Sequence, residues 1–129
     1  MEIYQKSKRE DTSENGQHPY AVIVTCSDSR VPAEHIFNAG IVELFFIRTA
    51  GNVIGDYALG SVEYGAEYLG TKLIVVLGHT NCGAVDAALH GGAHGAIATI
   101  TDEISACLPV DCDPRAAECR KQYFPYYGQ

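Results

Sequence analysis

Tyr20-Ala-Val-Ile-Val-Thr25, followed directly by Cys26-Ser-Asp-Ser-Arg30, decides the fold of this chain. The first stretch is short, rich in β-branched residues and apolar throughout, which is typical of a strand buried on both faces. Glu43-Leu-Phe-Phe-Ile47 and Leu73-Ile-Val-Val-Leu77 have the same character, and each also runs into a polar segment. We therefore predict three parallel strands joined by helices, an α/β fold.

Helical patterns separate these stretches. Val31-Pro32-Ala33-Glu34 predicts the start of a short helix, because Pro is favoured at the first helical position. Between positions 54 and 69 apolar residues recur every three or four positions, which predicts a core-facing helix of about 13 residues. Two further helices are expected over residues 84–89 and 97–108.

Right-handed crossover connections allow the strand order 2-1-3. The chain then moves first to one side of the first strand and afterwards to the other, with helices on both faces of a small three-layer structure. In such sheets ligands bind beyond the carboxyl ends of the strands, at the point where the winding reverses. The first and third strands flank this point, and they lead into Cys26 and into residues 79–82.

Length, composition and charge indicate the class of protein. The 129 residues suit a single domain, with residues 1–16 as an N-terminal arm and residues 109–129 as an irregular tail. Hydrophobic residues make up 47% and charged residues 19%, which excludes a disordered or fibrous chain. The net charge of −7 disfavours nucleic acid as a partner, because an acidic surface repels phosphate. No apolar run reaches the roughly 18 residues of a membrane span, and the N-terminus lacks a signal-like segment, so we expect a cytoplasmic protein.

The five cysteines are odd in number, and a disulfide framework is not expected in an intracellular chain. Cys26 and Cys82 each follow an apolar, strand-like run. The other three lie in a polar region later in the sequence, at Cys107, Cys112 and Cys119. The first pair is therefore the candidate for chemistry.

Cys26, His79 and Cys82 form a Cys2His donor set. Thiolate and imidazole suit zinc, and three protein ligands leave the fourth tetrahedral position open for water, as in catalytic zinc sites. Two alternatives stay open. Either the cysteines are small buried hydrophobic residues, or Cys107 and Cys112 form a rival metal pair without a histidine.

Asp28 and Arg30 follow Cys26 at two-residue steps, so all three side chains point to one side of an extended segment. An Asp held in a bidentate pair with Arg is ionised and has a fixed orientation. It can then accept a hydrogen bond from the attacking hydroxide and direct a lone pair of that hydroxide toward an electrophile. The alternative is an ordinary surface ion pair, or one that only holds the loop in place.

Four motifs, in this order and spacing, resemble those of the β-class carbonic anhydrases: Cys26-Ser-Asp-Ser-Arg30, Arg48-x-x-Gly-Asn52, Ser61-Val-Glu-Tyr64 and Gly78-His-x-x-Cys-Gly83. The resemblance extends over about residues 17–108. It implies that one zinc ion per chain is held by Cys26, His79 and Cys82. It also implies that Asp28 and Arg30 form the catalytic dyad.

The same resemblance implies a set of substrate-binding residues. Gln17 stands nine residues before Cys26, where plant-type members have a glutamine that hydrogen-bonds bicarbonate. Gly83 would offer its backbone N–H to the substrate oxygen. In the family a neighbouring subunit largely lines the small apolar CO2 pocket, at positions that correspond to Phe45, Ala50 and Tyr64. For the two aromatic residues an ordinary core role is the alternative.

The implied activity is zinc-dependent, reversible hydration of CO2 to bicarbonate and a proton, in a homodimer or higher homo-oligomer. One alternative keeps the site but hydrolyses carbonyl sulfide or carbon disulfide, as relatives of this family do. The other is a truncated zinc-binding pseudoenzyme that serves as an interaction subunit. The family usually continues after the helix at 97–108 with another helix and further strands, whereas residues 121–129 show no strand-like run, so those strands are expected to be missing.

Overall fold

The computed structural model describes residues 2–108, and the chain divides into two compact units, Met1–Leu77 and Gly78–Gln129. The tail expected over residues 109–129 lies outside the described residues, and so do Cys112 and Cys119. Within residues 2–108, no helix combines the length and the apolar character that crossing a bilayer requires.

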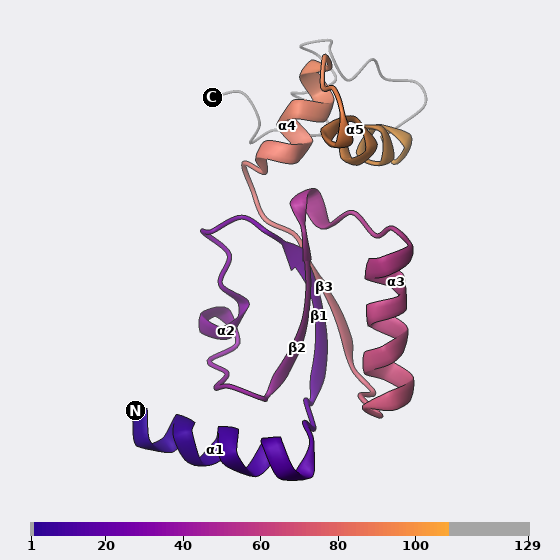
Figure 1. Cartoon of the computed structure of the whole chain (residues 1–129). Coiled ribbons are helices and arrows are strands. Elements are labelled where there is room, and N and C mark those ends of the chain that lie inside the picture. Colours follow the sequence, from indigo (N-terminus) through magenta and orange to yellow (C-terminus); the bar gives the residue numbers. More distant parts are fainter. Residues whose placement is uncertain (1, 109–129) are drawn as a thin grey trace. The chain divides into compact units, whose positions relative to one another are not determined.

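The first unit is built on a three-stranded parallel sheet with the order β2-β1-β3 (Figure 1). β1 is Ala21–Cys26, β2 is Leu44–Thr49 and β3 is Ile74–Leu77. This order confirms the predicted 2-1-3 winding. β1 continues one residue further than predicted, so that Cys26 is itself paired with Thr49 of β2.

The two faces of β1 pack against different helices, because successive side chains of a strand point to opposite sides. Ile23 lies in the cluster formed with α2 (Ala33–Ile36), and Val24 lies in the cluster against which α3 (Asp56–Glu63) packs. Figure 1 shows these two helices on opposite sides of the sheet. Every residue of β1 is buried, which explains why its sequence is apolar throughout instead of alternating.

α3 continues directly into a π-helical turn, η2 (Tyr64–Tyr68). Together the two elements form the helix predicted over positions 54–69, although the sequence pattern did not indicate the wider turn. Gly65 lies in this turn, where an added Cβ would stand 2.7 Å from Cγ2 of Val22. The helix backbone therefore approaches β1 at a position that leaves no room for a side chain.

α1 (Glu2–Asn15) precedes the sheet and is linked to it by an ion pair. Nζ of Lys8 donates a hydrogen bond to Oε1 of Glu43 at 2.6 Å, and the backbone N–H of Gly40 donates to Oε2 at 2.8 Å. The hydrogen bond from Lys8, and to a lesser extent that from Gly40, holds the pKa of Glu43 below its ordinary value of 4.5. The pair connects α1 to the segment that leads into β2.

The second unit contains α4 (Gly83–His90) and α5 (Ala96–Ala106), which contact each other. These are the two helices expected near residues 84–89 and 97–108. Glycines with positive φ form the connection between them, at Gly91, Gly92 and Gly95. Such backbone conformations favour glycine because it lacks a Cβ.

Candidate active site

The candidate ligands follow the carboxyl ends of two paired strands. Cys26 is the last residue of β1 and is buried. Thr25 lies opposite Leu77, the last residue of β3, so the chain leaves β3 at the same end of the sheet as Cys26. His79 follows within this exit segment, and Cys82 directly precedes α4.

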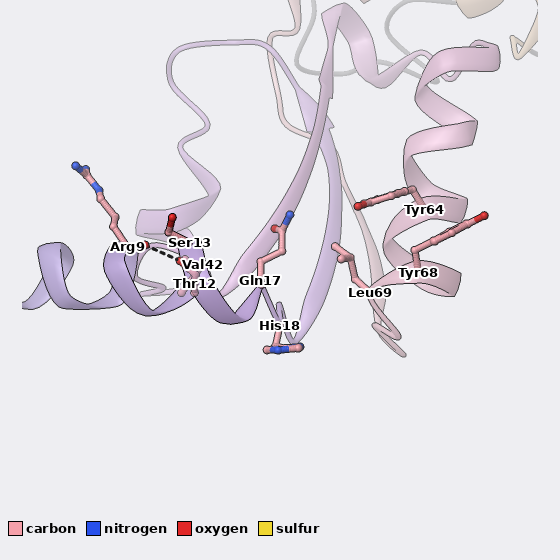
Figure 2. A pocket seen from close by; sticks show the side chains of 10 residues that line it. Arg9, Thr12, Ser13, Gln17, His18, Val42, Tyr64, Tyr68 and Leu69 are labelled. Atoms are coloured by element: carbon pink, nitrogen blue, oxygen red, sulfur yellow. Dashed lines mark hydrogen bonds between the residues drawn. The ribbon is translucent and has the colours of Figure 1, made fainter.

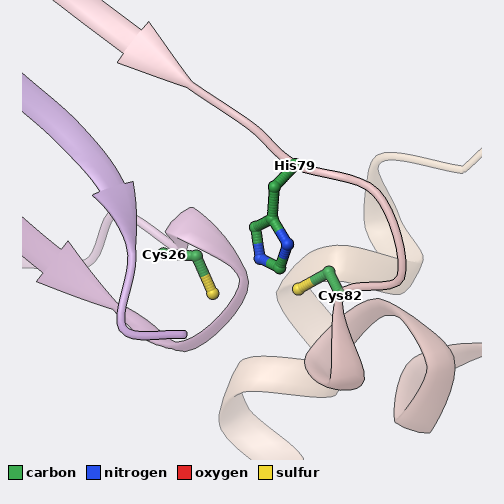
Figure 3. Close-up of side chains that lie close together, drawn as sticks. All are labelled: Cys26, His79 and Cys82. Carbon is green, nitrogen blue, oxygen red and sulfur yellow. The ribbon is translucent and has the colours of Figure 1, made fainter. Parts of the chain in front are cut away.

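Figure 3 shows the side chains of Cys26, His79 and Cys82 directed toward one another. Their ligand atoms, two sulfurs and a ring nitrogen, all lie within 4.8 Å of one another. Tetrahedral zinc holds sulfur at about 2.3 Å and nitrogen at about 2.0 Å, which separates the ligand atoms by roughly 3.5–4 Å. The three residues therefore fit zinc in donor chemistry and, after a small contraction, in spacing. Within residues 2–108, no other group of three or more His, Cys, Asp or Glu side chains brings its ligand atoms together in this way.

Asp28 and Arg30 form a bidentate ion pair in the loop after β1. Nε of Arg30 donates to Oδ1 of Asp28 at 2.9 Å, and Nη2 donates to Oδ2 at 2.7 Å. The backbone N–H of Arg30 adds a third hydrogen bond, to Oδ1 at 2.8 Å. The Asp28 side chain is only 15% exposed, against 61% for Arg30. Both carboxylate oxygens are thus held in place by hydrogen bonds from Arg30.

The end of β2 and the turn that follows it contact the end of β1 and the loop after it. Arg48 donates from Nε to the carbonyl of Cys26 at 3.1 Å and from Nη2 to the carbonyl of Asp28 at 2.9 Å. In the 3₁₀ turn η1 (Ala50–Asn52), the Gly51 N–H donates to Sγ of Cys26 at 3.4 Å. The sequence marked Arg48-x-x-Gly-Asn52 as a motif of family resemblance but indicated no role for its members.

The expected substrate-binding residues are divided between two ends of the sheet. Ala50 begins η1, beside the end of β1 that carries Cys26. Phe45 is the second residue of β2 and pairs with Val22, near the opposite end. Its ring centroid lies 6.0 Å from that of Tyr64. Gly83 begins α4 directly after Cys82.

Gln17 lies in a pocket of about 690 Å³ at the amino end of the sheet (Figure 2). The ring of Tyr64, also in this pocket, stacks on that of Tyr68 with centroids 5.4 Å apart. The pocket is lined by Arg9, Thr12, Ser13, Gly16, Gln17, His18, Val42, Tyr64, Tyr68 and Leu69. The structure thus groups Gln17 with Tyr64, and it separates both from the Cys26 end of β1.

Comparison with known proteins decides the family. The sequence profile described as carbonic anhydrase matches residues 21–122. The fold resembles the β-carbonic anhydrase of the fungal pathogen Aspergillus fumigatus, with a TM-score of 0.64 and 29% identity over 78% of this chain and 54% of that one. The chain belongs to the β-class carbonic anhydrase family.

Two further proteins are similar to this chain. Carbonic anhydrase 2 of Mycobacterium tuberculosis is 58% identical over 74 residues, which make up 57% of this chain and 36% of that protein. A carbon disulfide hydrolase has 27% identity and a TM-score of 0.52 over 64% of this chain and 42% of that one. The matched stretch therefore spans about a third of the mycobacterial protein.

Proposed function

We propose that this β-class family member catalyses the zinc-dependent, reversible hydration of CO2 to bicarbonate. The observation that carries the proposal is the combination of a Cys2His group with zinc spacing and a bidentate Asp28–Arg30 pair. The Cys2His group lies at and beyond the carboxyl ends of β1 and β3, and the ion pair lies in the loop after β1. Cys26, His79 and Cys82 would hold the metal. When bound, zinc lowers the pKa of a water ligand toward neutrality and so supplies the nucleophile.

The protein's own groups orient the reactants. The carboxylate of Asp28, fixed by Arg30 at both oxygens, accepts a hydrogen bond from the attacking oxygen and turns its lone pair toward the carbon of CO2. The Gly83 N–H and the Gln17 amide donate to oxygens of the product bicarbonate. Phe45, Ala50 and Tyr64 provide the apolar surface that holds CO2.

The complete site requires two copies of the chain. β1 has six residues, so its ends are about 16 Å apart. Gln17 lies before the first residue of β1 and Cys26 is the last, so the amide of Gln17 does not reach the metal ligands of its own chain. A second copy, related by two-fold symmetry, would bring its Gln17, Phe45 and Tyr64 to this site. We therefore expect at least a homodimer.

Stopped-flow assays on protein of known zinc content test the activity. We expect CO2 hydration by the wild type, with one zinc per chain, and loss of zinc and activity in Cys82→Ser. Cys107→Ser is the matched control, because Cys107 is exposed and belongs to the rival pair. Equal zinc content in the two variants would contradict the ligand assignment. Zinc-loaded wild type without CO2 turnover would contradict the proposed activity and favour a pseudoenzyme.

The same assay with carbonyl sulfide and carbon disulfide distinguishes the second candidate activity. The likeness to a carbon disulfide hydrolase favours including these substrates. All three molecules are linear and would approach the same apolar surface. Faster turnover of either sulfur compound than of CO2 would replace the proposed substrate while leaving the metal site intact.

Mixing two variants with impaired activity tests whether Gln17 serves the partner's site. A heterodimer of Asp28→Asn with Gln17→Ala contains one site in which both residues are intact, provided that Gln17 acts across the interface. Equal mixing with random exchange makes half of the dimers mixed, so about a quarter of wild-type activity should return. Activity equal to the mean of the two parent variants would show that Gln17 does not act across the interface.

A further inference from the structure

We propose that Arg48, Gly51 and Asn52, in and before the turn η1, are positioning residues of the metal centre. They hold the ends of the two strands from which the candidate ligands emerge. The inference rests on the proposed zinc site, and it assigns a role to a motif that the proposed reaction does not use.

Asn52 connects two strands that are not neighbours in the sheet. Its Nδ2 donates to the carbonyl of Leu77 at 2.7 Å, across 25 residues of sequence. β2 and β3 flank β1, so no ladder hydrogen bond can join them directly. The Asn52 amide makes this connection at the last residue of β3, two residues before His79. It therefore fixes the point from which the chain departs toward that ligand.

Gly51 acts on the other ligand-bearing strand. Its N–H points to Sγ of Cys26 at 3.4 Å, within the range for a hydrogen bond to sulfur. Gly51 has φ +67° and Asn52 has φ +60°. Glycine and asparagine are the residues that adopt this left-handed conformation most readily. The turn thus directs the Gly51 N–H at Cys26 and the Asn52 side chain at Leu77.

Arg48 fixes the loop that carries the dyad. Its guanidinium donates to the carbonyls of Cys26 and Asp28, which lie on either side of Ser27. A planar fork of donors can serve two carbonyls at once, whereas the single ammonium of lysine cannot do so in the same geometry. The position of the Asp28 carboxylate relative to Cys26 is therefore set partly from β2.

These contacts resemble the outer hydrogen bonds that orient ligands in metal sites. Removing such a bond typically weakens metal binding by about 10- to 100-fold. If η1 only stabilised the fold, its loss would lower the midpoint of unfolding without changing the ligand field of a bound metal. A positioning role predicts changes in both metal affinity and metal spectrum in protein that is still folded.

Cobalt titration of matched asparagine variants tests the inference. Asn52→Asp keeps the size of the side chain but replaces the donor with an acceptor facing the Leu77 carbonyl. Asn52→Gly keeps the left-handed backbone and removes the amide. Asn38 is the control, because it also has positive φ (+50°) but lies after α2 and outside the turn η1. Arg48→Lys provides an independent variant should the Asn52 variants fold poorly.

We expect Co²⁺ to bind the wild type with a thiolate charge-transfer band that is weakened in Cys26→Ser and disappears when Cys26 and Cys82 are both replaced by Ser. Both Asn52 variants and Arg48→Lys should bind Co²⁺ about 10- to 100-fold more weakly, with shifted d–d bands. Asn38→Asp and Asn38→Gly should match the wild type. Folded Asn52 and Arg48 variants with wild-type affinity and spectrum would overturn the inference alone. A wild type that binds no Co²⁺ through its thiolates would overturn the zinc proposal, and this inference with it.

Discussion

Asp28 and Arg30 are joined through both carboxylate oxygens, with hydrogen bonds of 2.9 and 2.7 Å from the guanidinium. The two residues are separated by one position, and the backbone N–H of Arg30 closes the same loop on Oδ1. This short, closed arrangement presents a carboxylate that has little rotational freedom. It belongs to the end of the sheet where Cys26 lies, so its orientation is relevant to the proposed reaction.

Asp28→Asn should retain zinc and lose most of its hydration activity. The amide keeps the shape of the side chain but offers only one acceptor oxygen, so it cannot pair with Arg30 and the attacking oxygen in the same orientation. A loss of about 10²–10⁴-fold in kcat is expected, as for a positioned acid–base group. Stopped-flow rates per bound zinc measure this. Unchanged turnover at unchanged zinc content would show that the pair only fixes the loop.

Gln17→Ala should weaken anion binding without affecting the metal. Loss of one hydrogen bond to a charged ligand corresponds to about 10- to 100-fold in affinity. Inhibition constants for bicarbonate and acetate measure the effect. Gln5→Ala is a suitable control, because Gln5 lies in α1 but outside the Gln17 pocket. Equal inhibition constants in the wild type and Gln17→Ala would remove Gln17 from the substrate site.

Gly65→Ala should destabilise the fold, whereas Gly60→Ala should stabilise it. A Cβ at position 65 meets Val22 at 2.7 Å and Phe45 at 3.2 Å, and the Val22 side chain is fully buried in the core. Overpacking of this kind costs about 1–3 kcal/mol. At Gly60 in α3 nothing lies within 4 Å, so alanine gains about 0.5–1 kcal/mol from reduced backbone entropy. Urea unfolding measures both. A Gly65→Ala variant as stable as Gly60→Ala would contradict the close approach of η2 to β1.

Glu43→Gln should lower stability at neutral pH but not in acid. The pKa of Glu43 is lowered by the hydrogen bond from Lys8, so its contribution is fully present above 4.5 and is lost as the pH falls through the lowered value. Free energies of unfolding from pH 7 to pH 3 should therefore converge for wild type and variant at the acid end. Glu10→Gln, which removes an exposed partner of Lys6, serves as control and should change little at any pH. A difference between wild type and Glu43→Gln that does not vary with pH would exclude the ion pair as its cause.

The strand positions and the ligand set could be predicted from the sequence because they depend on residue type and local spacing. A strand buried on both faces must be apolar at every position, so β1 is recognised from its composition alone. β2 and β3 are also largely apolar, although both are partly exposed in this structure. The right-handed crossover rule then limits the order to one that brings the ends of β1 and β3 together. Cys26 and residues 79–82 follow these strands directly, so their proximity could be predicted, and the resemblance to a known family led to the same residues.

Three features were decided by the tertiary structure. Asn52 and Leu77 are 25 residues apart, and their hydrogen bond depends on how β2 and β3 flank β1. The π turn brings Gly65 close to Val22 and Phe45, an approach that helical periodicity does not predict. The separation of Gln17 from Cys26 depends on β1 being fully extended between them. The sequence by itself determined which segments are strands and which side chains carry donor chemistry, because these depend on residue type and local spacing. Which groups meet across the sheet was determined only by packing, because hydrogen bonds between distant segments depend on the placement of whole strands.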